Sequence, residues 1–289
     1  MLTVYYRQQI RMSTNAIIDA SNANIDQVSF TEAKRNKQGG LGVQFKYAGQ
    51  SFEMRLPHMN FPGGLLQRED EKSGNVTYSL IGSLKGCDPY AKNRSENNDD
   101  MSKLYNFLLD IQEKLILAAT ENSSKWFGKK RGEESIRDSF NSRSILSVSS
   151  DKVGDEYVPN GKYPPSFKLK IPVYDGRVAM DVVDSSAKPI ALSVESLRSV
   201  FPKGVAGRLL VSGSVYIIGQ SFGVTWRVIM AQVFPQTRRT AASVFEAVED
   251  LPEDAPEEEQ EATPVVEPLP ETVAEAPAPS RKRRVVAQV

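Results

Sequence analysis

Cysteine and histidine are nearly absent from this chain of 289 residues. It has one cysteine, Cys87, and one histidine, His58. A single cysteine excludes a disulfide within the chain. It also excludes zinc sites built from cysteine and histidine, which take about four such ligands. Such sparse cysteine use fits a reducing compartment. The sequence therefore predicts no metal site and no cofactor.

Long apolar runs are missing as well. No run of about 18 apolar residues is present, so the sequence predicts no membrane-spanning helix. The opening stretch, "MLTVYYRQQIRMSTN", lacks the continuous apolar segment of a secretory signal. We therefore expect an intracellular protein with no membrane partner.

The usual motifs of catalysis do not occur. His58 stands in the loop-like "LPHMNFPGG" with no nucleophile motif beside it, and Cys87 is expected to be a small buried or loop residue. The glycine pairs at 39–40 and 63–64 have neither the Gly-Lys-Ser/Thr step of a phosphate loop nor a dinucleotide-binding pattern. We interpret both pairs as turns, and the sequence predicts a protein that is not an enzyme.

The net charge of zero conceals a strong asymmetry. The chain has 36 basic and 36 acidic residues, but 246–279 holds twelve acidic residues and no basic one, and "RKRR" follows at 281–284. Residues 1–245 therefore carry 32 basic and 24 acidic residues, a net charge of +8. A basic body joined to an acidic tail suggests a polyanionic partner; the alternative is a mildly basic domain with a solubilising tail.

The acidic tail, 246–289, is rich in Glu, Pro and Ala and is expected to be disordered, because it has little apolar surface to bury. We expect it to lie over the basic surface of the body as a mimic of the polyanionic partner, and to recruit other proteins once that partner displaces it. The basic cluster that ends the tail reads as a nuclear-import signal or as a phosphate contact. The acidic residues assigned to regulation are Glu253, Asp254, Glu257, Glu258 and Glu259, and the import candidates are Arg281, Lys282, Arg283 and Arg284.

Alternating apolar residues predict a strand-rich body. "LGVQFKYAGQSFEMRLP" predicts a hairpin, "NVTYSLIGSL" a third strand, and "SFKLKIPV" a strand followed by an Asp-Gly turn. Two long strands end the body, and the last is apolar on both faces. Two apolar faces indicate a closed barrel or a sheet with something packed on its outside.

One segment has a helical pattern. Apolar residues recur at three- and four-residue spacing over 101–118, and Asp99 or Asp100 can cap the helix. A short second helix is expected at 133–140. Together these make a helical insertion at about 99–141 between two strand blocks, within a mostly β (α+β) domain over 1–245.

Basic residues interleaved with aromatic residues point to single-stranded nucleic acid. Cations follow the phosphates, and aromatic faces stack on bases with little sequence preference. Trp226 and Tyr216 could equally be core residues, and the Trp126 cluster could be a helix cap or a partner site. The candidate nucleic-acid-binding residues are Lys46, Arg55, Lys125, Trp126, Phe127, Lys129, Lys130, Arg131, Lys168, Lys170, Phe222, Trp226 and Arg227.

"PPSFKLKIPVYDGRVAMDVVDSSAKPIAL" and "GSVYIIGQSFGVTWRVIMAQVFP" resemble the C-terminal half of the single-stranded-DNA-binding proteins of nucleocytoplasmic large DNA viruses. The similarity covers about 163–235 and lies chiefly in a Phe-Gly-x-x-Trp-Arg step, carried here by Phe222, Gly223, Trp226 and Arg227. The acidic tail also resembles that of phage replication proteins that bind single-stranded DNA. The resemblance implies an OB-like closed β-barrel that coats single-stranded DNA during viral replication.

The combined prediction is a protein that coats single-stranded DNA in viral replication, recombination or repair, without strong sequence specificity. Its expected location is the host nucleus or a viral replication site. In this prediction the acidic tail covers the binding groove as a DNA mimic, and it recruits replication proteins once DNA displaces it. The alternative is a non-enzymatic scaffold of a virion or replication complex, which uses its barrel and tail for protein contacts. Oligomeric state, site size and preference between DNA and RNA do not follow from the sequence.

Overall fold

The structure is a computed structural model, and it describes residues 17–35, 39–71 and 74–234. The chain divides into two units, 1–237 and 238–289, and every described residue belongs to the first. The acidic tail, its basic cluster and the boundary predicted at 245 all lie outside the described residues. The following description concerns the first unit alone.

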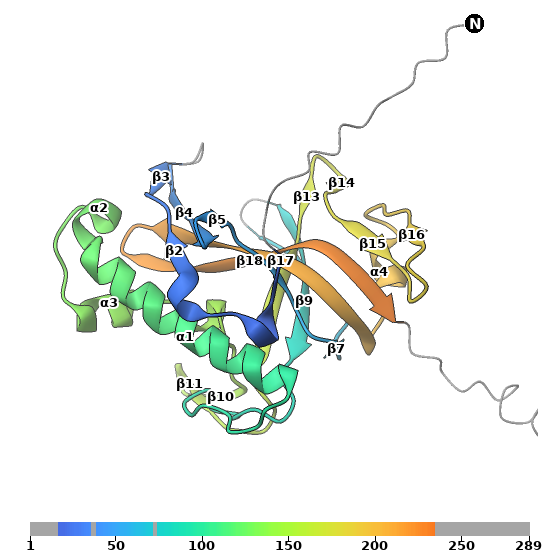
Figure 1. The fold of residues 1–289 in the computed structure, drawn as a ribbon, viewed down its shortest axis with the longest axis horizontal. Helices are drawn as coiled ribbons and strands as arrows, with labels where there is room; N and C mark the ends of the chain where they lie inside the picture. Colours follow the sequence, from blue (N-terminus) through green and yellow to red (C-terminus); the bar gives the residue numbers. More distant parts are fainter. Residues whose placement is uncertain (1–16, 36–38, 72–73, 235–289) are drawn as a thin grey trace, which may run out of the picture. The chain divides into compact units, whose positions relative to one another are not determined.

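Strands are the main regular structure of this unit, and four helices and three short 3-10 turns accompany them among the described residues (Figure 1). This confirms the mostly β (α+β) class. The strands are β1 (Ile17–Asp19), β2 (Val28–Phe30), β3 (Lys34–Arg35), β4 (Leu41–Tyr47), β5 (Gln50–Ser51), β6 (Glu53–Arg55), β7 (Met59–Phe61), β8 (Leu65–Glu69), β9 (Val76–Ser83), β10 (Ser150–Val153), β11 (Glu156–Pro159), β12 (Ser166–Ile171), β13 (Val173–Tyr174), β14 (Arg177–Val178), β15 (Asp181–Val183), β16 (Pro189–Ile190), β17 (Val205–Ile218) and β18 (Ser221–Phe234). The helices are α1 (Asp100–Glu121), α2 (Ser123–Phe127), α3 (Glu133–Ser139) and α4 (Leu197–Val200), and the 3-10 turns are η1 (Ala20–Asn22), η2 (Ile25–Gln27) and η3 (Ser142–Ser144).

The antiparallel pair β17–β18 is the spine of the main sheet. The path of hydrogen-bonded strands runs β1-β6-β17-β18-β12-β9-β8, and β4 and β7 also pair with β17. Gly219 takes a positive φ of 60° at the turn that joins the two long strands, a conformation that glycine adopts without a Cβ clash. The predicted pair of long strands is therefore confirmed.

A bulge explains why β18 reads as apolar on both faces. Val211 pairs with Val228 and Leu210 with Met230, so Ile229 has no partner on β17. An extra residue in one strand reverses which positions face inward. Trp226 and Val228 are buried before it and Ala231 after it, whereas Met230 is exposed. The apolar residues that seem to form a second face are therefore mostly inward-facing too, because after the bulge the odd-numbered positions point inward in place of the even-numbered ones.

The strands form an open path in place of the predicted closed barrel. β7 pairs with β17 and β8 pairs with β9, but the segment 62–64 between β7 and β8 interrupts the ladder. Its neighbours bond to the turn after α4: Leu65 N donates to Phe201 O at 2.9 Å, and Gly204 N donates to Phe61 O at 3.1 Å. These bonds take the place of pairs that would continue the ladder, and Pro62 has no N–H to offer.

The predicted helix is α1, and its cap is Asp99. The Asp99 carboxylate accepts hydrogen bonds from the N–H groups of Met101 and Ser102, both at 3.0 Å. Hydrogen bonds from Ser102 hold the pKa of Asp99 below its usual range. The apolar stripe of α1 joins the same core as the inner faces of the strands. No helix in the described part of the chain is long and apolar enough to cross a membrane.

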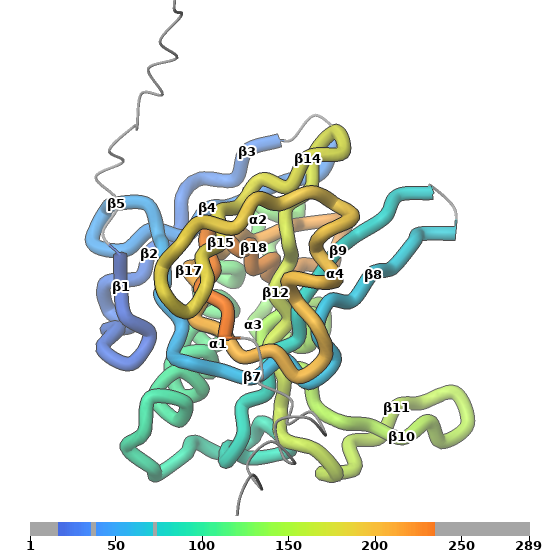
Figure 2. The backbone as a smooth tube through the Cα atoms, turned by 90° about the vertical axis from the view of Figure 1, so that its right-hand side faces the viewer, coloured from blue at the N-terminus to red at the C-terminus, as the bar shows by residue number. Residues whose placement is uncertain are grey.

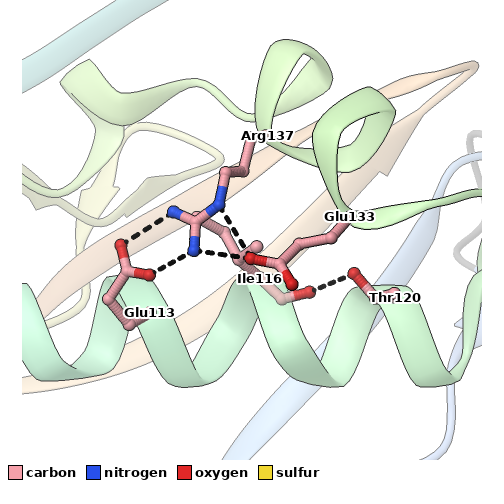
Figure 3. A network of polar contacts seen from close by, with 5 residues as sticks. All are labelled: Glu113, Ile116, Thr120, Glu133 and Arg137. Atoms are coloured by element: carbon pink, nitrogen blue, oxygen red, sulfur yellow. Dashed lines mark hydrogen bonds and ion pairs between the residues drawn. The ribbon is translucent and has the colours of Figure 1, made fainter.

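Ion pairs fasten α3 to α1. Arg137 of α3 donates to both carboxylate oxygens of Glu113 on α1, at 3.0 and 2.5 Å, and to Glu133 one turn earlier in its own helix (Figure 3). Arg137 lowers the pKa of Glu113 through these hydrogen bonds. The three helices α1, α2 and α3 all lie within the segment 99–141 where the sequence predicts helices.

Candidate nucleic-acid interface

The strand register builds a polar row across the outer face of the sheet. Directly paired residues of neighbouring strands project from the same face. Four successive pairings, between β17 and β18, β18 and β12, β12 and β9, and β9 and β8, link one residue of each strand. We call this set the cross-sheet row: Ser212, Arg227, Lys170, Ser79 and Leu66.

A cleft of about 430 Å³ opens beside this row and shares Lys170 and Ser79 with it. Lys168 and Lys170 of β12 both reach it, because they alternate with the buried Phe167 and Leu169. We call it the sheet cleft. It is lined by Thr77, Tyr78, Ser79, Asn141, Arg143, Ser144, Ser147, Lys168, Lys170, Tyr216, Val224, Thr225 and Trp226.

The basic residues of this face do not take part in the ion pairs of the described residues. The four ion pairs found in the described part of the chain join Arg55 to Asp19, Arg94 to Asp110, and Arg137 to Glu113 and Glu133. Lys168, Lys170 and Arg227 take part in none of these, and no carboxylate among the residues of 17–35, 39–71 and 74–234 lines the sheet cleft. Their charge is therefore available to phosphates, which attract Lys and Arg without regard to base sequence.

Two tyrosines stand beside these cations. Tyr174 is 54% exposed, and the guanidinium carbon of Arg227 lies 5.9 Å from the centre of its ring. The predicted Asp-Gly turn, with φ of 49° at Asp175 and 72° at Gly176, holds Tyr174 at the end of β13. Exposed tyrosine rings next to cations are the surface on which unstacked bases pack.

Asn141 and Gly223 set the position of Tyr216. Its hydroxyl oxygen accepts a hydrogen bond from Asn141 Nδ2 at 3.0 Å. Below it lies Gly223 of β18, where an added Cβ would come within 2.5 Å of that hydroxyl oxygen and 2.8 Å of Ser144 Oγ. The absence of a side chain at Gly223 therefore lets Tyr216 lie across β18 at the wall of the sheet cleft.

A second hollow, of about 660 Å³, continues from the cross-sheet row toward the N-terminal strands. Lys34, Arg35 and Lys46 line it, and it shares Ser212 with the row. Glu53 is its one acidic lining residue. The structure thus brings the predicted Lys46 toward the same face as Lys168, Lys170 and Arg227.

Four of the candidate nucleic-acid-binding residues are aromatic, and the structure buries all four among core side chains, although Trp226 also lines the sheet cleft. Trp226 is 1% exposed and meets Phe45 and Phe167 with ring centres 5.6 and 5.3 Å apart. Phe222, which is fully buried, packs against Trp126 and Phe127 of α2, and these two are also buried. Trp226 and Phe222 occupy alternating positions of β18 that face the core. The side chains of α2 pack against the beginning of that strand.

Two predicted arginines are committed to structural contacts. Arg55 forms a two-pronged ion pair with Asp19, with distances of 2.5 and 2.8 Å, and this pair lowers the pKa of Asp19. Arg131 donates to Ser135, Ser139 and the carbonyl of Gln220, and its guanidinium carbon lies 5.1 Å from the ring centre of Phe127. Arg131 therefore ties the loop after α2 to the β17–β18 turn and is not free for phosphate.

The three other basic residues of that loop, Lys125, Lys129 and Lys130, are exposed and line neither hollow. The single cysteine, Cys87, is buried, which raises the pKa of its thiol to about 11. His58 is exposed and touches the ring of Phe234. The predicted tail residues, from Glu253 to Arg284, lie outside the described residues.

Sequence patterns missed several residues of this face. Arg143 and Asn141 come from the loop after α3, and Ser79 and Thr77 from β9, so only the fold brings them to β12. The sequence did contain patterns that indicate an exposed position for Tyr174 and Tyr216. Tyr174 precedes an Asp-Gly turn, and Tyr216 alternates with the apolar Val215 and Ile217, which indicates an outward position.

No family model matches the chain, and no curated protein matches it. Among solved structures, it is similar to the single-stranded DNA-binding protein of bacteriophage Enc34 in complex with ssDNA, with 10% identity, a TM-score of 0.36, and coverage of 72% of this chain and 92% of that one. It is also similar to gp2.5, a single-stranded DNA-binding protein of bacteriophage T7, with 12% identity, a TM-score of 0.36, and coverage of 71% and 99%. These are phage proteins, and they give no support to the narrower resemblance to large DNA viruses. At such identities and TM-scores, what this chain binds has to follow from its own surface.

Proposed function

We propose that this protein binds single-stranded DNA without strong sequence preference, along the outer face of its main sheet. The observation that carries the proposal is the cross-sheet row with its sheet cleft. There, Lys168, Lys170 and Arg227 form no ion pair with any residue that the structure describes, and they stand beside Tyr174 and Tyr216. Cations track the phosphates and tyrosines stack on bases, and neither contact depends on base identity.

The proposal favours single strands over duplex. A stacking tyrosine needs a base whose face is open, and the bases of a duplex offer their faces to one another. Coating of DNA in viral replication is the role we infer for the protein.

Titration of a fluorescent oligo-dT at several salt concentrations tests the proposal. The logarithm of the affinity should fall linearly with the logarithm of the salt concentration, with a slope of about −0.7 for each phosphate contacted. The double variant Lys168→Gln/Lys170→Gln should reduce that slope by about 1.4 if each lysine meets one phosphate.

The matched control is Lys188→Gln/Lys203→Gln, which removes the same charge from exposed lysines that line none of the hollows described above. Its slope should stay close to that of the wild type. An affinity that barely responds to salt, or tighter binding to duplex of the same length, would contradict the proposal.

Contact with another protein is a second candidate function, and one observation favours it. Val153 and Val158, on the two-stranded β10–β11 hairpin, are 63% and 46% exposed. Exposed apolar side chains on a projecting hairpin suit a partner protein. Val153→Ser/Val158→Ser should then abolish capture of a replication protein while oligo-dT binding stays intact.

A further inference from the structure

The hairpin of β10 and β11, which we call the arm, forms a sheet of its own. Figure 2 shows it projecting from the body, away from the strands of the main sheet. All its residues from Asp151 to Pro159 are exposed. Because the arm adds little to the core, its side chains are free to serve a contact outside the fold.

The strand register gives the arm two different faces. Lys152 pairs with Tyr157 and Ser150 with Pro159, so these four share one face. Asp151 pairs with Val158 and Val153 with Glu156, which puts both strand carboxylates on the opposite face. One face thus carries a lysine beside a tyrosine, and the other carries the acidic and apolar residues.

The lysine–tyrosine face borders a hollow of about 280 Å³, which we call the arm pocket. Ser150, Tyr157 and Pro159 line it from the arm, and Tyr90 and Leu146 line it from the body. None of the described residues that line it is acidic. Its walls therefore combine aromatic and aliphatic surface with a few hydrogen-bonding groups.

Arg143 joins the arm pocket to the sheet cleft. It lines both hollows, and its guanidinium carbon lies 5.2 Å from the centre of the Tyr157 ring. Arg143 is exposed and takes part in none of the four ion pairs of the described residues. A cation without an acidic partner thus stands where a strand leaving the sheet cleft would meet the arm.

We infer that the arm pocket takes one unstacked base of the same DNA strand, with its ring on Tyr157 and the flanking phosphates near Arg143 and Lys152. This rests on the proposed binding of single-stranded DNA by the sheet. A base has an apolar ring face and a polar edge, and the pocket offers surfaces for both. Its volume is at the lower end for ligand pockets, which suits one planar ring system better than a peptide.

The substitution Tyr157→Ala tests the inference, with Tyr163→Ala as its matched control. Tyr163 is 61% exposed and has Lys162 Nζ 5.9 Å from its ring centre, but it lines neither the sheet cleft nor the arm pocket. Both variants are titrated with dT oligomers of increasing length, from about 4 to 16 nucleotides, the range of site sizes seen for single OB folds. Thermal unfolding confirms that each variant is folded.

Tyr157→Ala should weaken binding about 5- to 150-fold, but only for oligomers long enough to pass from the sheet cleft to the arm. This range is a stacking energy of ~1–3 kcal/mol per base, converted at 1.4 kcal/mol for each tenfold change. Tyr163→Ala should change affinity less than twofold at every length. Lys168→Gln/Lys170→Gln should weaken binding at every length.

An unchanged affinity of Tyr157→Ala for all lengths that the wild type binds would overturn the arm pocket and leave the proposed function standing. An equal loss at every length, the shortest included, would also overturn it, because Tyr157 would then not belong to a part of the binding site that only longer oligomers reach. If the wild type binds no oligomer at all, the proposed function itself fails.

Discussion

Gly223 is the residue on which the position of Tyr216 depends. The two are paired across β17 and β18, and the Tyr216 hydroxyl occupies the space where a side chain at 223 would be. A Cβ atom at 2.5 Å from an oxygen forces one of them to move, and the free end of a tyrosine moves most easily. The glycine of the Phe-Gly-x-x-Trp-Arg step thus serves the surface, whereas its Phe222 and Trp226 serve the core.

We predict that Gly223→Ala weakens oligo-dT binding about fivefold or more, because displacing Tyr216 removes a stacking surface that contributes at least ~1 kcal/mol. In a Tyr216→Ala background, Gly223→Ala should then change affinity less than twofold. Fluorescence anisotropy measures all four proteins. Equal losses in both backgrounds would show that Gly223 acts through something other than Tyr216.

Residue type alone could not separate the aromatics that face the core from those that face the solvent. Trp126 lies among Lys125, Lys129 and Lys130, a composition typical of a binding loop, yet α2 turns it inward onto Phe222. The lysines of β12 were predictable, because strict alternation with Phe167 and Leu169 leaves them outward. Tertiary packing decides the first case and local periodicity decides the second.

At the scale of elements, regular patterns were predictable and interruptions were not. The α1 stripe, the Asp99 cap, the Asp-Gly turn and the long β17–β18 pair all follow from the sequence. The bulge at Ile229 did not, because a single extra residue has no signature in a strand that is apolar throughout. Because of that bulge, the strand has apolar residues at both alternating sets of positions, a pattern that allowed either a closed barrel or a covered sheet; the resemblance then favoured the barrel.

The ion pairs between α3 and α1 give a prediction for stability. Arg137→Ala should lower the free energy of unfolding at pH 7 by about 1 kcal/mol, a small effect because the side chains are 43–51% exposed and solvent screens them. Urea unfolding measures this, and Arg137→Lys should retain part of it because it keeps the charge.

The pH dependence of that difference follows from Glu113. Because its pKa is lowered in the folded state, its contribution is present above its ordinary value of 4.5 and is lost as the pH falls below it. The wild type and Arg137→Ala should therefore converge in stability once the pH falls below the lowered pKa of Glu113. A difference that persists there would mean that Arg137 acts through packing.

At the scale of the whole molecule, charge is divided between two parts of the chain. Residues 1–245 carry a net charge of +8, and 246–279 holds twelve acidic residues. Within the described part, the sheet cleft and the arm pocket have no acidic lining residue. We therefore propose that the acidic segment competes with DNA for the cations of this face.

Deletion of 246–289 should tighten oligo-dT binding several-fold at low salt, and the gain should fade as added salt shortens the screening length. A full-length variant with Gln or Asn at Glu253, Asp254, Glu257, Glu258 and Glu259 is the matched control, because it removes charge without changing length. It should reproduce part of the gain. Unchanged affinity of both proteins at low salt would show that the acidic segment does not compete with DNA.

The central claim is that DNA lies on the outer face of the sheet, against tyrosines and not against the tryptophans. Photocrosslinking of oligo-dT that carries 5-iodouracil, followed by peptide mapping, tests this directly. We predict crosslinks at Tyr174 and Tyr216, and none at Trp126 or Trp226. Crosslinks confined to the loop that follows α2, with none on β13 or β17, would contradict it.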